Sequence, residues 1–331
     1  MIFKCKNCGG NTVYSPEKKQ MHCPYCDGAE TQDRFDFPEF EGNYTICPNC
    51  RGEISTDVHT ASSRCPYCDT YLIFNERVEG EYLPAYVLPF QIGKDKCKEM
   101  LKEQFKKKTF APTDFLSEAR LETIEGDYVP FWLFDYDSVT DFTAEGRKVR
   151  RWTSGNYQYT ETSYYEIRRN MSAGFRKVPA DASTPMPDEV MDLMEPYDYT
   201  QLQKFEPQFL SGFMSEKFNL PAIKYVDRVK VKMQESIDAY LKGTYTGYSS
   251  VSPLSKTTQY NNEQTHYALL PVWVYHYEYA GKKYPFYVNG QTGKIVGKVP
   301  VSLPKVLAYG GTLWGALALI LVLLSFTFRF M

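Results

Sequence analysis

HCPYCDG (residues 22–28) and RCPYCDT (residues 64–70) are two copies of one cysteine turn. Each copy follows another Cys-x-x-Cys pair after the same 14 intervening residues, and the two sets of four are offset by 42 residues. The eight cysteines are Cys5, Cys8, Cys23, Cys26, Cys47, Cys50, Cys65 and Cys68. A Cys-x-x-Cys turn directs two sulfurs to one side, and a second turn completes a tetrahedral shell. The spacing therefore predicts two zinc ribbons, each with one four-cysteine site for Zn²⁺.

Such zinc sites are expected to be structural, because four thiolates leave no open coordination position. Disulfides are the main alternative, but MIFKCKNCGG at the N-terminus offers no apolar signal-peptide core, and a ninth cysteine, Cys97, would be left over. Redox activity of a Cys-x-x-Cys pair would belong in a βαβ context, which the pattern lacks. Small residues after the second cysteine, Gly9, Gly28 and Gly52, are expected to let backbone N–H groups turn toward the thiolates.

An apolar segment closes the chain. Residues 306–328 contain no charge over 23 positions and are bounded by Lys305 and Arg329. At about 1.5 Å per residue, a helix of this length crosses the hydrocarbon core of a bilayer, whereas core helices of soluble domains seldom run so long without a polar face. The mean hydropathy of the whole chain, −0.44, indicates that the rest is water-soluble. We therefore expect a single-pass tail anchor in the cell membrane.

The orientation follows from the thiols and the flanking charges. Zinc thiolates indicate a reducing compartment, and Lys294, Lys298 and Lys305 precede the apolar segment. We expect the N-terminal domains to be cytoplasmic.

The region between the ribbons and the apolar segment also repeats. PFWLFDYD (130–137) aligns without a gap to PVWVYHYE (271–278), at an offset of 141 residues. Each copy lies downstream of a segment with helical periodicity, 94–108 and 228–242 respectively, and a further short helix is expected at about 187–195. The middle region therefore reads as two related units, each a helix followed by an antiparallel sheet.

The fold class expected for the whole chain is α+β. The expected divisions are zinc ribbon 1 (1–40), zinc ribbon 2 (41–80), a first α+β unit (81–200), a second α+β unit (201–302) and a C-terminal transmembrane anchor (303–331).

No catalytic residues are predicted. Asp135, Asp137, His276 and Glu278 are the polar members of the repeated strands, and no cysteine or serine nucleophile motif accompanies them. A strand running into a turn accounts for them without chemistry, although a membrane-bound, hydrolase-like enzyme that uses the middle region stays open. GQTGK (290–294) has its glycines too close together for a phosphate loop.

The remaining alternative is that the ribbons bind nucleic acid. Their net negative charge disfavours it. Residues 1–80 hold 8 Lys/Arg against 12 Asp/Glu, a net charge of −4, before two tetrathiolate sites add negative charge. Basic residues cluster elsewhere, at 106–108, 147–151, 168–169 and 176–177. These clusters either face anionic lipid headgroups or form a solvated surface balanced by carboxylates.

Together these motifs resemble a known family. The tandem ribbons, VPADAS (178–183), EPYDYTQLQKFEPQFLSGFMSEKF (195–218), LPVW (270–273), YPFYVNGQTGKIVG (284–297) and the final apolar segment resemble bacterial membrane proteins, chiefly Gram-positive, described as transcription-factor-IIB-type zinc ribbon-containing. The resemblance implies a setting in phage-shock-like envelope-stress operons. It also implies a non-enzymatic scaffold that recruits phage-shock-protein-A-like and SPFH or virion-core-like proteins to the membrane.

Overall fold

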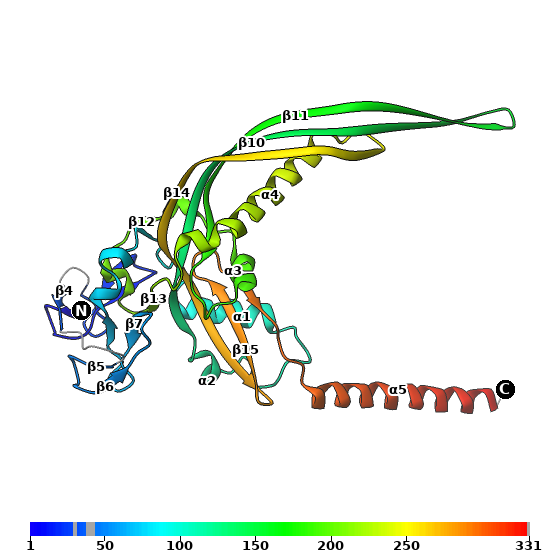
Figure 1. Ribbon diagram of the computed structural model, residues 1–331. Coiled ribbons are helices and arrows are strands. Elements are labelled where there is room, and N and C mark those ends of the chain that lie inside the picture. The colour runs from blue at the N-terminus through cyan, green and yellow to red at the C-terminus, as the bar shows by residue number, and fades with distance from the viewer. Residues whose placement is uncertain (29–31, 38–43, 330–331) are drawn as a thin grey trace.

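The computed structural model describes residues 1–28, 32–37 and 44–329. It mixes helices and strands: two small ribbons at the N-terminal end, a body built on one twisted sheet, a long arm that rises from the body, and an isolated C-terminal helix (Figure 1). The expected α+β character and the C-terminal helix are confirmed. The expected boundary between residues 40 and 41 lies outside the described residues.

The ribbons are short hairpins. In the first, β1 pairs with β4 and β2 with β3; in the second, β5 pairs with β6 and β7 with β8. The strands are β1 (Ile2–Cys5), β2 (Val13–Ser15), β3 (Gln20–His22), β4 (Gln32–Phe35), β5 (Tyr44–Ile46), β6 (Glu53–Ser55), β7 (Thr60–Arg64) and β8 (Tyr71–Ile73).

The central sheet has the strand order β12-β9-β14-β10-β13-β7-β8, with β11 beside β10, β15 beside β14 and β16 beside β15. Ribbon 2 thus contributes β7 and β8 to this sheet. The other strands are β9 (Tyr86–Val87), β10 (Glu125–Ser154), β11 (Tyr157–Asp181), β12 (Gln203–Lys204), β13 (Met214–Glu216), β14 (Ser250–Tyr279), β15 (Lys282–Asn289) and β16 (Ile295–Gly297).

The two repeated motifs lie on neighbouring strands, β10 and β14. These strands pair antiparallel from Glu125 opposite Val274 to Arg147 opposite Ser250. They cross at Val129 opposite Leu270, directly before the two motifs, so each motif pairs with the residues that precede the other one. Because strands from both ranges share one sheet, the division into units 81–200 and 201–302 stays a prediction.

Helices cover the body of the sheet on both faces. The α-helices are α1 (Lys94–Phe105), α2 (Glu118–Leu121), α3 (Asp188–Met194), α4 (Val226–Gly243) and α5 (Leu303–Arg329). Single turns of 3₁₀ helix lie at Asn75–Arg77, Gly80–Tyr82, Tyr199–Gln201, Pro207–Leu210 and Ala222–Tyr225. Helices α1, α3 and α4 match the segments that sequence periodicity identified at 94–108, 187–195 and 228–242, and α2 is an addition.

Alternation along β14 explains the two layers. Tyr275 and Tyr277 pack with Leu101 of α1 in the largest core cluster. Leu270 and Val272, with the opposite parity, pack with α3. Successive residues of a strand point to opposite faces, so a strand that is apolar at both parities must be covered on both sides.

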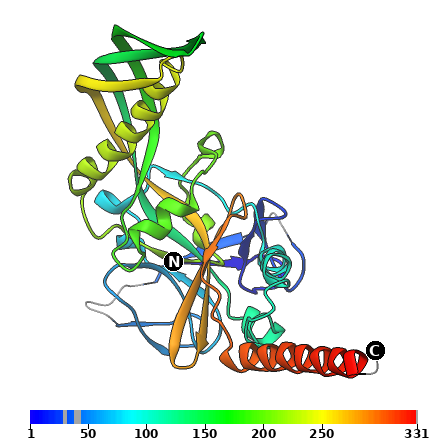
Figure 2. The same cartoon turned by 90° about the vertical axis from the view of Figure 1, so that its right-hand side faces the viewer.

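The arm consists of the outer parts of β10, β11 and β14, with α4 packed on one face (Figures 1 and 2). Ile237 and Leu241 of α4 meet Phe142 and Ala144 of β10 in a small separate cluster. Only one face of the sheet is apolar in the arm. The arm therefore has two layers, the sheet and α4. The last part of the hairpin, toward the turn at Gly155, extends beyond α4.

A buried ion-pair network fixes the base of α4. Arg228 reaches Asp181 at 2.8 Å and Asp192 at 2.7 Å, and Lys232 reaches Glu195 at 2.7 Å. The Asp181 carboxyl is almost fully buried, and its burial raises its pKa to about 6 although the Arg228 guanidinium opposes the shift. The network therefore joins α3, α4 and the end of β11.

Helix α5 projects from the base of the body (Figures 1 and 2). The window Leu303–Val322 has a mean hydropathy of 1.6, and none of it is buried against the rest of the chain. Its first turns rest on the body, since Lys305 Nζ donates to the carbonyl of Ala111 at 2.7 Å and Phe110 meets the ring of Tyr309. By length and composition this helix is able to cross a membrane.

Replacing Asp127 by Asn is expected to stabilise the fold above neutral pH. Burial, with smaller contributions from the carboxylates of Glu216 and Glu125, raises the pKa of Asp127 from 3.8 to about 7. Its Oδ1 is shielded from solvent without a hydrogen-bond partner among the described residues. Because the folded-state pKa lies above the unfolded one, the stabilisation is complete below pH about 4 and is lost as the pH rises through 7.

The asparagine variant lacks this titration, so its free energy of unfolding at pH 8 should exceed that of the wild type by about 2 to 4 kcal/mol. The two proteins should differ little at pH 4. Thermal unfolding in detergent, followed by circular dichroism, measures the difference, with Glu278→Gln as an exposed-carboxyl control. An equal shift at both pH values would contradict the assignment.

Candidate metal centres

The eight predicted cysteines form two groups of four. Within each group the sulfur atoms all lie within 4.8 Å of one another. In ribbon 1, Cys5 and Cys26 are 3.5 Å apart, as are Cys8 and Cys23. In ribbon 2, the sulfurs of Cys47 and Cys68 are 3.7 Å apart, as are those of Cys50 and Cys65. The grouping that the spacing predicted is confirmed.

The four cysteine turns share one backbone pattern. In each, the N–H of the first cysteine donates to the carbonyl five residues later, as from Cys5 to Gly10, and the residue four positions later donates back, as from Gly9 to Cys5. That returning residue has a positive φ in all four turns: 73° at Gly9, 61° at Asp27, 64° at Arg51 and 58° at Asp69. Left-handed backbone, which is usual for glycine and tolerated by aspartate, closes the turn.

The three glycines contribute differently to these turns. The backbone N–H of Gly28 hydrogen-bonds the Cys26 sulfur, as expected, whereas only Gly9 of the three adopts the left-handed conformation. At Gly52 the requirement is space, because a Cβ there would lie 2.4 Å from the ring of Tyr67, and the equivalent Gly10 meets Tyr25 at 2.5 Å. The tyrosine of each Cys-Pro-Tyr-Cys turn thus packs against the partner turn of its own ribbon.

The surroundings of the sulfurs differ between the two sites. The backbone N–H of Cys8 lowers the pKa of Cys5 to about 7, against the opposing effect of burial. Burial is the largest influence on Cys47 and raises the pKa of that thiol to about 12. Cys47 and Cys65 belong to an apolar cluster that includes Ile2 of ribbon 1, so site 2 lies deeper in the protein than site 1.

The arrangement fits a tetrahedral metal ion. Four thiolates at about 2.3 Å from a central Zn²⁺ would lie roughly 3.8 Å from one another. The closest sulfur pairs, at 3.5 and 3.7 Å, are near this value and well beyond the roughly 2.0 Å of a disulfide. Each group could therefore hold a metal ion. The choice of zinc rests on the thiolate donor set, which suits soft or borderline metals.

The ninth cysteine, Cys97, is separate from both groups. It is fully buried in α1, and burial raises the pKa of its thiol to about 12. A buried, protonated thiol of this kind packs in the core and is unreactive.

Both ribbons are integral to the body. Tyr14 of ribbon 1 donates its N–H to the carbonyl of Ser211 at 2.7 Å, and its ring packs against Phe209 at a tilt of 58°. In ribbon 2, β7 pairs with β13, and Ser62 donates to the carbonyl of Phe213 at 2.8 Å. The metal sites consequently hold together elements that complete the core.

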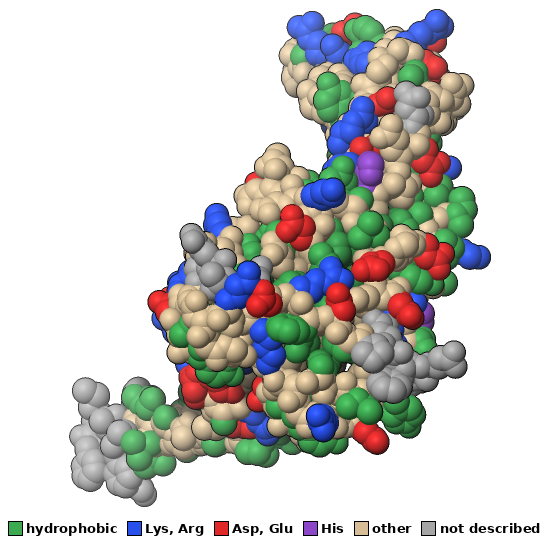
Figure 3. Space-filling model, turned by 90° about the vertical axis from the view of Figure 1, so that its left-hand side faces the viewer, with side chains coloured by type: hydrophobic (Ala, Val, Ile, Leu, Met, Phe, Trp, Pro, Cys, Tyr) green, Lys and Arg blue, Asp and Glu red, His purple; other side chains and the backbone are tan. Residues whose placement is uncertain are grey.

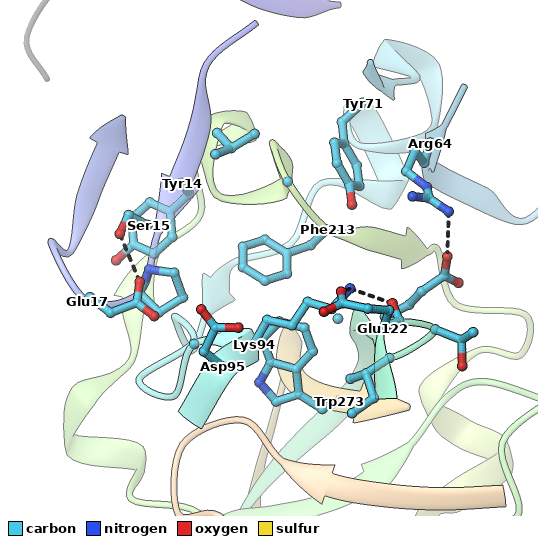
Figure 4. Close-up of a pocket in the computed structure, with 18 of the residues that line it drawn as sticks. Tyr14, Ser15, Glu17, Arg64, Tyr71, Lys94, Asp95, Glu122, Phe213 and Trp273 are labelled. Carbon is cyan, nitrogen blue, oxygen red and sulfur yellow. Dashed lines mark hydrogen bonds and ion pairs between the residues drawn. The ribbon is translucent and has the colours of Figure 1, made fainter. Parts of the chain in front are cut away.

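A cleft of about 840 Å³ lies where the two ribbons meet the body (Figure 4). Phe213 and Trp273 line it, with charged side chains around them. Those charges are paired: Arg64 with Glu125 at 3.2 Å and Lys94 with Glu122 at 3.6 Å. On the ribbon 1 side of the cleft, the Ser15 hydroxyl donates to the Glu17 carboxylate at 3.0 Å (Figure 4).

The four polar residues of the repeated strands do not form one site. Asp135 pairs with Lys177 at 3.2 Å and Asp137 with Arg176 at 2.7 Å, on the part of β10 that leads into the arm. His276 lies at the other end of the body, at the edge of the cleft, and Glu278 follows it on β14. The two carboxylates thus serve ion pairs away from the histidine.

Sequence reasoning located the basic cluster at 147–151 but missed the ribbon–body cleft. The hairpin tip carries its basic residues at 147–151, before Gly155, and most of its aromatic residues at 157–165, after it. The cleft left no signal in the sequence, because its lining comes from six separate segments.

The chain is similar to a curated protein over nearly its whole length. It is 39% identical over 330 residues to "Uncharacterized protein YdjG" of Bacillus subtilis (strain 168), covering 98% of this chain and 97% of the relative. No protein-family model matches the chain, and no solved structure matches it.

Changing one ligand in either ribbon is expected to remove one metal ion per chain. Cys23→Ser and Cys65→Ser occupy equivalent positions, 42 residues apart, and each leaves three thiolates at its site. Protein purified from zinc-supplemented cells should contain two zinc ions per chain for the wild type and one for either variant, measured by elemental analysis.

Cys97→Ala is the matched control, because it removes a thiol outside both groups and should keep both ions. Two ions in either ligand variant, or none in the wild type, would contradict the assignment.

Proposed function

This chain belongs to the same family as YdjG of Bacillus subtilis, and we propose that it is a non-enzymatic, membrane-anchored scaffold. Its two ribbons would each carry a structural Zn²⁺ bound by four cysteines. Its body and arm would present a rigid surface to cytosolic partners. The observation that carries this proposal is α5, an apolar helix whose window Leu303–Val322 has no buried residue and touches the body only in its first turns.

Anchoring through α5 is supported by what the helix exposes. Leu307, Leu317 and Leu321 are each more than half exposed, which in water would leave a large apolar surface unpaired. Lys305 lies at the end nearest the body and donates to the body's backbone. A bilayer would cover the apolar surface, with lysine at the interface.

We propose that the ribbons and body lie in the cytoplasm and that α5 crosses the cell membrane once. The thiolate sites favour this orientation because free thiols persist in a reducing compartment. Near α5, pockets lined by Lys107, Lys108 and Lys298 lie beside its first turns, consistent with the preference of basic residues for the cytoplasmic side.

The partners are proposed from the resemblance to membrane proteins with transcription-factor-IIB-type zinc ribbons. By that resemblance the scaffold recruits phage-shock-protein-A-like and SPFH or virion-core-like proteins during envelope stress. The acidic ribbons, with a net charge of −4 over residues 1–80, support protein contacts over nucleic acid. Enzymatic function has less support, because the candidate carboxylates Asp135 and Asp137 are engaged in ion pairs.

Ending the chain after Lys305 is expected to move the protein from the membrane to the soluble fraction. The deletion removes the apolar window but keeps the described body, whose contacts with α5 are confined to its first turns. Fractionation followed by an alkaline wash measures the shift. Full-length protein should stay in the washed membranes, and the truncated protein should leave them almost completely.

Replacing residues 306–328 by an unrelated apolar helix of equal length is the matched control and should restore membrane retention. Recruitment is read from the location of a phage-shock-protein-A-like partner in the same strains. A partner that stays at the membrane when the truncated chain is soluble would refute the scaffold role while leaving the anchor intact.

A further inference from the structure

We propose that the tip of the β10–β11 hairpin, residues 147–165, docks on a membrane surface that carries anionic lipid headgroups. This tip is the part of the arm beyond α4. The inference rests on the proposed crossing of α5 and adds a second, independent contact between the protein and the same bilayer.

The tip and its base carry an excess of positive charge. Residues 145–169 contain six Lys/Arg and three Glu, a net charge of +3 in a chain whose total is −2. Some of these cations are already engaged: Arg147 pairs with Glu145 at 2.8 Å, and Arg168 pairs with Glu166 at 2.7 Å. Arg169 donates to the backbone of Thr244.

Three cations remain for an external anion. Lys148, Arg150 and Arg151 form no ion pair with any carboxylate within the described part of the chain. Lys148 lies 5.2 Å from the ring of Tyr165, and Arg150 lies over Trp152 at 5.5 Å. These contacts are with aromatic rings and leave both cations without a carboxylate partner among the described residues.

The same tip exposes aromatic side chains. Trp152 and Tyr159 stand opposite each other on the two strands and stack at 5.5 Å with an angle of 12°. Tyr157 is 72% exposed and Tyr164 is 61% exposed. Trp and Tyr favour the headgroup level of a bilayer, where the ring is partly desolvated and its polar atom stays wet. A basic and aromatic tip therefore suits an anionic lipid surface.

The direction of the hairpin selects the membrane as the partner. Figure 1 shows the hairpin and α5 projecting from the same side of the protein, one from the arm and one from the base. Seen from the opposite side, Lys and Arg side chains gather at the upper end of the arm, away from α5 (Figure 3). Because the hairpin runs in the same direction as α5, a bilayer crossed by α5 at right angles would meet the arm.

The charges of the tip exclude it from the hydrocarbon core. Transmembrane helices tilt by about 20° on average, and by up to about 40°, relative to the bilayer normal. A tilt of α5 together with the body would bring the tip to the headgroup level, where the cations meet lipid phosphates. The arm, stiffened by α4, would then fix the orientation of the body on the membrane.

Fluorescence quenching by brominated lipids tests this docking in the full-length protein. The chain has four tryptophans, and the difference between the wild type and Trp152→Phe isolates the signal of Trp152. In vesicles of phosphatidylcholine with phosphatidylglycerol, lipids brominated near the headgroup should quench this signal severalfold more than in phosphatidylcholine alone. High salt should reduce the difference, because charge attraction is screened over about 10 Å or less.

Arg150→Glu with Arg151→Glu should abolish the quenching of Trp152. Lys282→Glu with Lys283→Glu is the matched control: it makes the same charge change at two exposed positions at the start of β15 and should leave the quenching unchanged. Equal thermal unfolding of the two double variants shows that the first one still folds.

The outcomes separate the two proposals. Protein that does not float with vesicles would overturn the anchor, whereas protein that floats with Trp152 unquenched in every lipid mixture would overturn the docking alone. Retained quenching in Arg150→Glu with Arg151→Glu would also overturn it. Binding of single-stranded RNA that this double variant loses, with Trp152 unquenched by lipid, would assign the tip to nucleic acid instead.

Discussion

The antiparallel pairing of β10 with β14 organises the whole protein. The ladder runs from Glu125 opposite Val274 in the body to Arg147 opposite Ser250 in the arm, and it passes through three environments. Both parities are apolar in the body, so α1 and α3 cover both faces. One parity is apolar in the arm, where α4 suffices. Past α4 the exposed side chains are basic and aromatic, and the hairpin is left for an external partner.

The ribbons solve a problem of size. Each has about forty residues and short strands, too few to bury an adequate core unaided. Their eight thiols form two four-cysteine sites, one in each ribbon. Other ribbon residues contact the body: β7 joins the central sheet, and Tyr14 packs on Phe209. Metal binding in such modules is coupled to folding. Metal binding in the ribbons should therefore also stabilise the core of the body, against which the ribbons pack.

Ion pairs have different roles in different places. Arg228 compensates the buried Asp181 and joins α3 to α4, whereas Asp127 is shielded near other carboxylates and has its pKa raised. A buried charge with a partner specifies geometry, and one without a partner favours its neutral form. In the cleft between ribbons and body, pairs such as Arg64 with Glu125 bridge separate modules, and at the surface they add little stability.

The sequence by itself determined what local chemistry and short periodicities encode. Cysteine spacing grouped the eight thiols correctly, helical periodicity located α1, α3 and α4, and the uncharged stretch located α5. Only the tertiary structure decided that the strands carrying the two repeated motifs are neighbours, with Val129 opposite Leu270, and that both ribbons dock on the body. Strand pairing across 141 residues depends on which surfaces remain to be buried after local structure forms, and no local pattern carries that information.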